Sequence, residues 1–297
     1  MDSRRTRSLR VGLVLAAGLA LAALLAPMVA TSTPIWADPD ERPSVTAPIP
    51  YDPGAIDLRA RLSPPSRAHW LGTDALGRDV ASRLLHGSRV SLSVGLLAAL
   101  AALAIGIPLG AVAGYRGGWI DHAVSRCMES ILCFPSLLLA LALLAAPPAI
   151  FSGLSAIVRV SLVIAVSGWI PIARFLRAEI LTLRDSDLVR AAEASGLPRR
   201  RILVRHLLPG ALAPVLVTAA FAVAGAMTLE AALSFLGLGV PPPTPTWGGL
   251  LFDAREHIYE AWWLALFPGV ALFAAVLTCN LIGEGLRDRL DPRTPRR

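Results

Sequence analysis

The sequence predicts an all-α, polytopic membrane protein with six transmembrane helices. Of its 297 residues, 55% are hydrophobic and only 16% are charged, and the mean hydropathy is positive at +0.60. A soluble domain carries about 25% charged residues. Six apolar stretches account for this composition, so we expect the chain to cross a bilayer six times.

All 28 basic residues are arginines, and the net charge is +7. They are scattered between apolar stretches instead of gathered in one soluble domain, so no nucleic-acid partner is expected. Cys127, Cys133 and Cys279 lack the spacing of metal ligands or disulfides. The five histidines are dispersed, and the sequence contains no H-E-x-x-H motif and no nucleophile elbow. Neither a metal site nor a catalytic grouping is therefore predicted, and the chain is not expected to be an enzyme.

The N-terminal part is predicted to contain one helix and one long external segment. Residues 1–10 carry four arginines, and residues 11–30 form an uncharged stretch long enough to cross a hydrocarbon core of about 30 Å. A cleaved signal peptide is the alternative for this stretch, although no small-residue cleavage site follows it closely. Residues 31–89 are expected outside the cytoplasm, with a short amphipathic helix at 80–85 lying at the interface.

Residues 90–286 are expected to form a core of five transmembrane helices. The second span, 90–115, contains Gly106, Gly110 and Gly114, and small residues at this spacing allow another helix to pack closely in lipid. An amphipathic connection at 116–129 should lie in the cytoplasm. The remaining spans are expected at 131–146, at about 154–181, at 210–238 and at 261–283.

Glu230 is the only acidic residue within the fifth span. An ionisable group at membrane depth costs several kcal/mol on insertion scales, so it should face the bundle or a water-filled path. Three roles remain open for it: a structural hydrogen bond to a neighbouring helix, a place near the outer mouth of a translocation path, and proton coupling.

A polar loop at 184–209, between the fourth and fifth spans, contains two short helix signals. The first can begin at Asp185, Ser186 or Asp187 and ends at Gly196, a residue type that tolerates the left-handed conformation. One face of this helix consists mostly of small side chains: Leu188, Ala191, Ala192 and Ser195. Small side chains allow close approach, so the helix is suited to enter a groove in another protein. A second helix can start at Pro198 and should end before Pro209.

This loop resembles the EAA signature of the permease subunits of binding-protein-dependent ABC importers. The signature reads Glu-Ala-Ala, three residues, Gly, nine residues, an apolar residue, one residue and Leu-Pro. The positions in register are Ala191, Ala192, Gly196, Leu208 and Pro209, whereas Arg190 occupies the Glu position and His206 the apolar position.

Other stretches are similar to the dipeptide, oligopeptide and nickel branch of the same family. They are the strings at 70–74 (Trp-Leu-Gly-Thr-Asp) and 76–79 (Leu-Gly-Arg-Asp), followed by 229–239 and 241–250. The resemblance implies a type I ABC importer permease-like fold and import of peptides or a related small solute such as nickel complexes. It also implies three kinds of partner: a second homologous permease subunit, two ATPase subunits and an extracytoplasmic substrate-binding protein.

The same resemblance implies that the loop docks on an ATPase. The implied docking residues are Leu188, Arg190, Ala191, Ala192, Glu193, Ser195, Gly196 and Pro209. The chain itself contains no phosphate-binding loop of the G-x-x-x-x-G-K-[ST] type, so ATP hydrolysis is expected in partner subunits and no cofactor is predicted.

The arginine distribution predicts the orientation. With both termini in the cytoplasm, 19 of the 28 arginines lie on the cytoplasmic side, including those of the tail at 287–297. The expected location is the bacterial inner membrane. Two other classes of function remain: an ion-coupled secondary transporter that uses Glu230, and a membrane scaffold without transport activity, which would have no need for a small-faced helix between its spans.

Overall fold

The protein is an elongated bundle of helices in the computed structural model, which describes residues 2–32, 47–146 and 151–290. Among these residues the only β-type pairings are two isolated bridges, and no strand is formed. Within these described ranges, five helices are long and apolar enough to cross a membrane, and a bent pair of helices makes six if it counts as one span. The predicted all-α membrane fold is confirmed.

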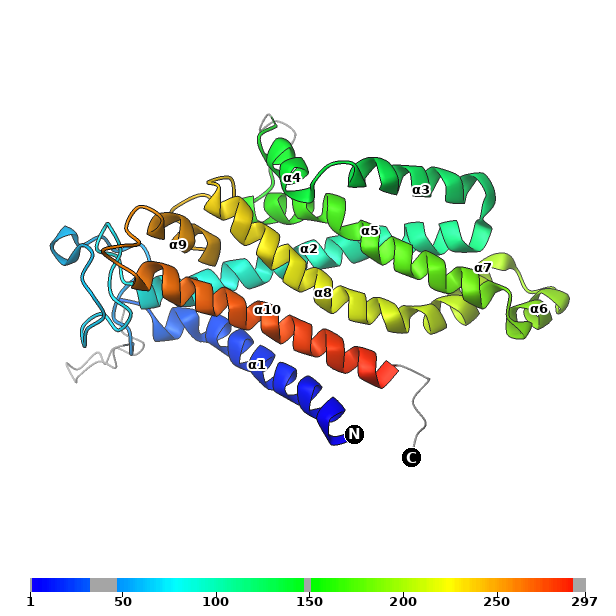
Figure 1. The fold of residues 1–297 in the computed structure, drawn as a ribbon, viewed down its shortest axis with the longest axis horizontal. Helices are drawn as coiled ribbons and strands as arrows, with labels where there is room; N and C mark the ends of the chain where they lie inside the picture. Colours follow the sequence, from blue (N-terminus) through cyan, green and yellow to red (C-terminus); the bar gives the residue numbers. More distant parts are fainter. Residues whose placement is uncertain (1, 33–46, 147–150, 291–297) are drawn as a thin grey trace, which may run out of the picture.

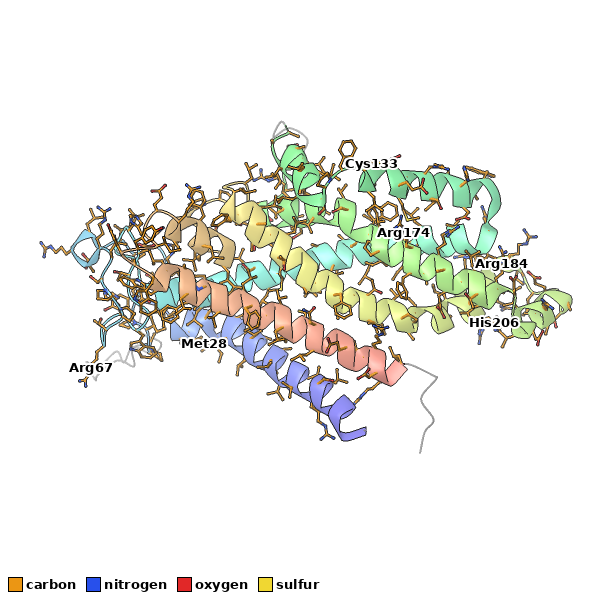
Figure 2. The ribbon with its side chains drawn as sticks, in the orientation of Figure 1. Met28, Arg67, Cys133, Arg174, Arg184 and His206 are labelled. Carbon is orange, nitrogen blue, oxygen red and sulfur yellow. The ribbon has the colours of Figure 1, made fainter. Side chains whose placement is uncertain are left out.

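The long helices run roughly side by side along the bundle, and its two ends differ (Figure 1). Its helices are α1 (Asp2–Val29), α2 (Val80–Arg116), α3 (Gly118–Leu132), α4 (Ser136–Leu144), α5 (Ala156–Arg184), α6 (Asp187–Ala194), α7 (Arg199–Ile202), α8 (Leu208–Phe235), α9 (Trp247–Ala254) and α10 (Trp263–Leu290). We call the two ends the α6 end and the α9 end. Arg184 and His206 lie toward the α6 end, and Met28 and Arg67 toward the α9 end (Figure 2).

The most extensive helix contact joins α2 to α5. Gly106, Gly110 and Gly114 lie against the α5 backbone: a Cβ atom on Gly110 would stand 2.5 Å from the carbonyl oxygen of Ala173, and one on Gly114 would stand 2.8 Å from that of Arg177. Side chains at these positions would push the two helices apart. The α2–α5 pair therefore forms the close-packed centre of the bundle.

The start of α2 differs from the prediction. Instead of a separate interfacial helix at 80–85, these residues form the first turns of α2, which runs unbroken for 37 residues. The Asp79 carboxylate caps this helix by accepting a hydrogen bond from the Ser82 backbone N–H at 2.8 Å. No strong helix breaker separates the amphipathic turns from the apolar ones, because the glycines between them are tolerated inside a helix.

The third span also differs from the prediction. Instead of a short connection at 116–129 followed by one span at 131–146, helix α3 runs back along the bundle and meets α4 at an angle of 84°. Pro135 lies at this bend and is the N-cap of α4. A proline there lacks the N–H that would continue α3, which explains the break. The Asp121 carboxylate joins α3 to α5 by accepting a hydrogen bond from Arg177 Nη2 at 2.6 Å.

The helix expected to end before Pro209 instead continues into the fifth span. Residues Leu203–Leu207 form a π-helical turn that connects α7 to α8, and Pro209 lies in the first turn of α8. A wider π turn shifts the backbone hydrogen bonds, and proline is tolerated in a first helical turn. Residues 147–150, which follow the predicted third span, and the tail from residue 291 onward lie outside the described residues.

Candidate functional site

The short helix α6 protrudes from one end of the bundle, and both of its ends are defined by backbone conformation (Figure 1). Ser186 occupies the N-cap position. At the other end Gly196 adopts φ +71°, its N–H donates to the Glu193 carbonyl at 2.9 Å, and the Leu197 N–H donates to the Ala192 carbonyl at 3.2 Å. This pair of bonds is a Schellman motif, which is why a glycine is suited to this position.

The α6 helix presents most of its polar and small residues to its surroundings. Val189 and Ala192 are buried and attach it to the bundle, where they join an apolar cluster with Ile180 and Ile202. The exposed residues of this helix and its C-cap are Asp187, Leu188, Arg190, Ala191, Glu193, Ala194 and Ser195. The predicted small face is therefore divided, since Ala192 points into the bundle and the others remain free for contact.

No side-chain hydrogen bond or ion pair joins α6 to the transmembrane helices in the part of the chain that the structure describes. The Ser195 hydroxyl donates to the Ala191 carbonyl within the same helix, and the nearby Arg184–Asp185 pair is separated by 3.7 Å. Apolar contact through one side alone holds α6 in place. The opposite side of α6 therefore exposes polar side chains that form no hydrogen bond or ion pair with the described transmembrane helices.

At the opposite end, the Glu230 carboxylate is fully buried between three helices. It accepts hydrogen bonds from the Ser234 hydroxyl at 2.7 Å and the Ser91 hydroxyl at 3.3 Å. The Ser91 oxygen in turn accepts the backbone N–H of Trp247, at the start of α9, at 3.1 Å. Glu230 thus links α8 to α2 and, through Ser91, to α9.

A nearby cavity does not include this carboxylate. The cavity, of about 420 Å³, lies between α2, α5 and α8 and is lined mainly by small and apolar residues, among them Ala226 and Leu229. Glu230 is not one of its lining residues, although Leu229 is its neighbour in sequence. Its polar partners lie on the side of α8 that faces α2 and α9.

The helix α9 packs closely on α8. A Cβ atom on Gly248 would stand 2.7 Å from the Cα of Ala231, so the two backbones are in direct contact. The Thr246 hydroxyl accepts the Gly249 N–H at 2.9 Å and caps α9, and the Trp247 indole N–H donates to the Leu84 carbonyl of α2 at 3.1 Å. These contacts fix α9 against the transmembrane helices.

A buried cluster of charges fixes the other end of α9. The Arg83 guanidinium pairs with Asp74 and, at 3.0 Å, with Asp253 of α9, while Arg78 Nε donates to Asp74 at 2.7 Å. Asp74 is 1% exposed and Arg83 is 5% exposed. Opposite charges buried in this way need one another, because an unpaired charge here would be strongly unfavourable.

Two further contacts strengthen the same region. His69 Nδ1 lies 2.9 Å from the Asp79 carboxylate, and the Trp263 indole N–H donates to the Thr73 carbonyl at 3.1 Å. Nearby, hydrogen bonds from the Ser32 hydroxyl and backbone N–H hold the pKa of Asp52 below its usual range. The conspicuous string at 70–79 therefore forms a structural joint between α2, α9 and α10.

The sequence could not show several of these residues to be important. Arg83 and Asp253 are 170 positions apart, and Ser91 and Glu230 are 139 positions apart. The only local signal was that Arg83 follows the helix cap Asp79 by one turn. No group of three or more histidine, cysteine or acidic side chains within the described residues could hold a metal ion.

Together, these features define a helical membrane protein with a fixed, charge-bearing cap at one end and a protruding, weakly attached helix at the other. Residues 106–296 match the family model described as binding-protein-dependent transport system inner membrane component. Because this match covers more than half of the chain, the protein belongs to that family of transport components.

Known relatives agree with this assignment. The chain is 39% identical to the dipeptide transport system permease protein DppC of Alkalihalophilus pseudofirmus, over 95% of this chain and 85% of that protein. It is also 39% identical to the glutathione transport system permease protein GsiD of Pectobacterium atrosepticum, over 82% of this chain and 80% of that protein.

The fold also matches a solved structure of the MetNI methionine ABC transporter in inward-facing conformations. The TM-score is 0.58 at 20% sequence identity, and the match covers 70% of this chain and 96% of the other. At this identity the likeness concerns the fold alone.

Proposed function

We propose that this chain is the permease subunit of an ATP-driven importer for dipeptides or other short peptides in a bacterial inner membrane. The peptide cargo is supported by the similarity to the dipeptide permease, and transport of a related small solute, such as glutathione or a nickel complex, is the alternative. The chain would form the path for the solute, and partner subunits would hydrolyse ATP.

The proposed orientation places the α6 end in the cytoplasm. Both termini of the described chain and the α2–α3 turn point toward this end, and so does the arginine-rich segment around α7 (Figure 1). Membrane proteins carry an excess of arginine and lysine on the cytoplasmic side. The α9 end and residues 47–79 would then face the outside, where a substrate-binding protein delivers its cargo.

The single observation that carries the functional proposal is the exposed face of α6. Leu188 is 59% exposed although it is apolar, and Arg190 and Glu193 have no ion-pair partner among the described residues. We assign this face to a groove of an ATPase subunit. The proposed contact residues are Leu188, Arg190, Ala191, Glu193 and Ser195, while Ala192, Gly196 and Pro209 set the position of the helix.

The proposed mechanism follows from how α6 is connected. ATP binding would close the two ATPase subunits and carry α6 with them as a rigid body. The chain from α7 through the π turn into α8 is helical without interruption, so displacement of α6 would reach the transmembrane bundle through α8. A second homologous permease would respond in the same way, opening a path between the two subunits.

We propose a structural role for Glu230 within this machine. Its complete burial and its two hydroxyl donors support a hydrogen-bonded junction between α2, α8 and α9 more than a place on the translocation path. Proton coupling would need access to water, and the carboxylate is 0% exposed. An ion-coupled secondary transporter is also disfavoured because the relatives are subunits of binding-protein-dependent systems.

The substitution Ala191→Trp in the complete transporter tests the proposal. Ala191 is exposed, so the larger side chain should leave the permease folded and in the membrane while it blocks entry of α6 into a groove. We expect at least a tenfold loss of ATPase subunits in pull-down and a loss of ATP-dependent peptide uptake. A tenfold loss of affinity corresponds to about 1.4 kcal/mol of binding free energy.

The matched control is Arg289→Trp, an exposed position in the last turn of α10 at the same end of the bundle. This variant should retain both ATPase binding and uptake. Normal ATPase binding and uptake by Ala191→Trp would contradict the assignment of α6. Peptide uptake that is abolished by a protonophore but resistant to vanadate would instead support the secondary transporter.

A further inference from the structure

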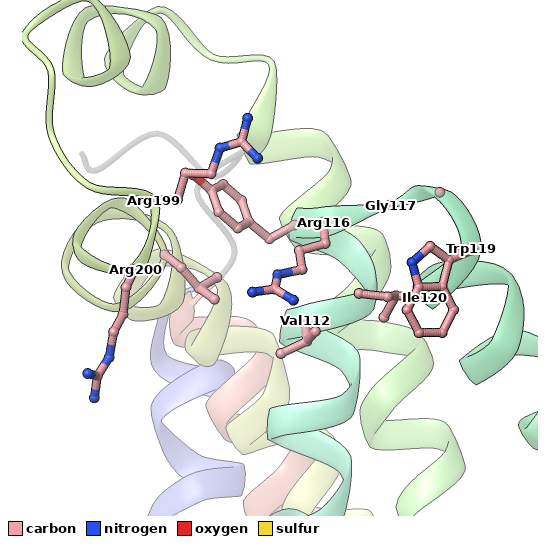
Figure 3. Close-up of a pocket in the computed structure, with 10 residues that line it drawn as sticks. Val112, Arg116, Gly117, Trp119, Ile120, Arg199 and Arg200 are labelled. Atoms are coloured by element: carbon pink, nitrogen blue, oxygen red, sulfur yellow. The ribbon is translucent and has the colours of Figure 1, made fainter.

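A cavity of about 720 Å³ lies beside the loop at 184–209, where α2 turns into α3 and α7 passes close by (Figure 3). Gly117 and Gly118 adopt φ +65° and φ +58°, and these left-handed conformations let the chain reverse between the two helices. The cavity is lined by Val112, Tyr115, Arg116, Gly117, Gly118, Trp119, Ile120, Arg199, Arg200 and Leu203.

The charged side chains that line this cavity are all positive. Three of its lining residues are arginines, and no acidic residue is among them. Arg116 reaches from the end of α2 toward α7, and Arg199 extends from α7 over the same space (Figure 3). Within the described part of the chain, none of the three guanidinium groups has an ion-pair partner. Like charges that border one cavity repel one another, so a bound anion would stabilise the arrangement.

A further polar atom at the cavity lacks a partner. The Tyr115 hydroxyl is buried and forms no hydrogen bond in the structure. A buried hydroxyl without a partner is unfavourable by a free energy comparable to a lost hydrogen bond, and such groups are uncommon. An acceptor oxygen on a ligand in this cavity would supply the missing bond.

The rest of the lining is apolar. Val112, Ile120 and Leu203 come from three different elements and line the same space. Trp119 is 79% exposed, which is unusual for so large an aromatic side chain in water but typical at the boundary between hydrocarbon and headgroups. The cavity thus joins a positive rim to an apolar wall at the end of a membrane-spanning helix.

We propose that this cavity binds an anionic phospholipid of the inner leaflet, such as phosphatidylglycerol. The phosphate accepts hydrogen bonds from Arg116 and Arg199, Arg200 adds positive charge at the rim, and an acyl chain lies along Val112, Ile120 and Leu203. The inference rests on the orientation given under the proposed function, which places the α6 end in the cytoplasm. Basic pockets between membrane helices on that side suit lipid headgroups of this charge.

This site would also influence coupling. Arg199 and Arg200 belong to the same loop as α6 and lie only a few residues beyond Gly196. A lipid held between these arginines and Arg116 ties the loop to the end of α2. The position of α6, and with it the response to ATP, then depends on the lipid composition of the membrane.

The test measures lipid retained by the complete transporter. The purified assembly is exchanged from nanodiscs containing phosphatidylglycerol and phosphatidylcholine into detergent, and native mass spectrometry counts bound phosphatidylglycerol. We expect the variant R116Q/R199Q/R200Q to bind this lipid about a hundredfold more weakly, because each arginine near a membrane surface contributes roughly fivefold. The single variant R116Q, with an expected loss of about fivefold, covers the case in which the triple variant misfolds.

The matched control is R287Q/R289Q, which removes two exposed arginines at the same end of the bundle but outside the cavity. It should retain the lipid. Equal retention by R116Q/R199Q/R200Q and the original protein would overturn the proposal. Displacement of the lipid by inorganic phosphate alone at millimolar concentration would also overturn it, since the site would then belong to a free anion. Lipid retention is read without ATP or peptide, so it is independent of whether the transport proposal holds.

Discussion

The two ends of the bundle are built in opposite ways. At the α9 end, buried ion pairs and hydrogen bonds join α2, α8, α9 and α10 through residues such as Asp74, Arg83 and Glu230. At the α6 end, a helix of eight residues is attached by Val189 and Ala192 and exposes nearly everything else. One end is fixed by polar contacts within the chain, whereas the other keeps its polar groups free.

This difference indicates where each end finds its partners. Buried polar contacts within the chain make a rigid element whose shape does not depend on another subunit. An exposed helix with unpaired charges gains its contacts only when another protein supplies them. The chain would therefore keep its outer face constant for delivery of the solute and leave its inner helix to follow the movement of the ATPases.

The largest expected effect on stability comes from Asp74→Ala at the α9 end. This change removes the shared partner of Arg78 and Arg83 and also the acceptor for the backbone N–H groups of Leu76 and Arg78. Loss of one partner from a buried ion pair costs about 3–5 kcal/mol. The midpoint of unfolding in detergent should fall accordingly.

The control for this prediction is Glu129→Ala, which breaks the exposed ion pair with Arg126 on α3. Exposed pairs contribute about 0–1 kcal/mol, so this variant should unfold almost as the original protein does. Similar losses of stability in Asp74→Ala and Glu129→Ala would mean that the charge cluster is not the joint we describe.

The next effect is expected for Glu230→Ala. Without this carboxylate, the buried hydroxyls of Ser91 and Ser234 lose their acceptor, which costs about 1–3 kcal/mol. Glu230→Gln keeps an acceptor oxygen and should therefore unfold closer to the original protein, with uptake that remains insensitive to a protonophore. Loss of uptake in Glu230→Gln at unchanged stability would point to a role on the solute path instead.

A third prediction concerns the centre between the two ends. Gly110→Ala places a Cβ atom 2.5 Å from the Ala173 carbonyl oxygen, so α2 and α5 must separate. Overpacking of this kind costs about 1–3 kcal/mol. Gly269→Ala in α10 is the control, because nothing lies within 4 Å of its Cβ position. If both variants unfold alike, the close contact of α2 with α5 is not needed for stability.

The smallest effect on stability is expected on the exposed face of α6. Leu188→Ser should change the free energy of unfolding by less than about 0.5 kcal/mol, because surface substitutions rarely do more. It should nevertheless weaken ATPase binding in pull-down, which would set this end apart from the α9 end. A large loss of stability would show that Leu188 packs within the permease itself.

The sequence predicted those features that depend on neighbouring residues. The start of α6 near Ser186 and its end at Gly196 follow from capping preferences, and the four-residue glycine spacing of α2 indicated a close helix contact. The long apolar stretches likewise defined most of the spans. Each of these signals lies within one or a few helical turns.

Other features depend on residues that are far apart in the sequence, or on which of several backbone conformations is most stable near a proline. Nothing in the sequence pairs Arg83 with Asp253, or shows that Ser91 lies beside Glu230. The 84° bend between α3 and α4, and the π turn before Pro209, reflect how the backbone accommodates a proline within a packed bundle. The local sequence shows where a proline lies, but it does not predict whether the backbone bends there or forms a π turn.

The most direct test of the account is site-directed crosslinking in the complete transporter. With Cys127, Cys133 and Cys279 replaced by serine, a photoactivatable group is attached to Cys introduced at Ala191 or at Tyr259, a fully exposed residue at the α9 end. We expect Ala191→Cys to crosslink to the ATPase subunit and Tyr259→Cys not to do so. A crosslink to the ATPase from Tyr259→Cys, with none from Ala191→Cys, would contradict it.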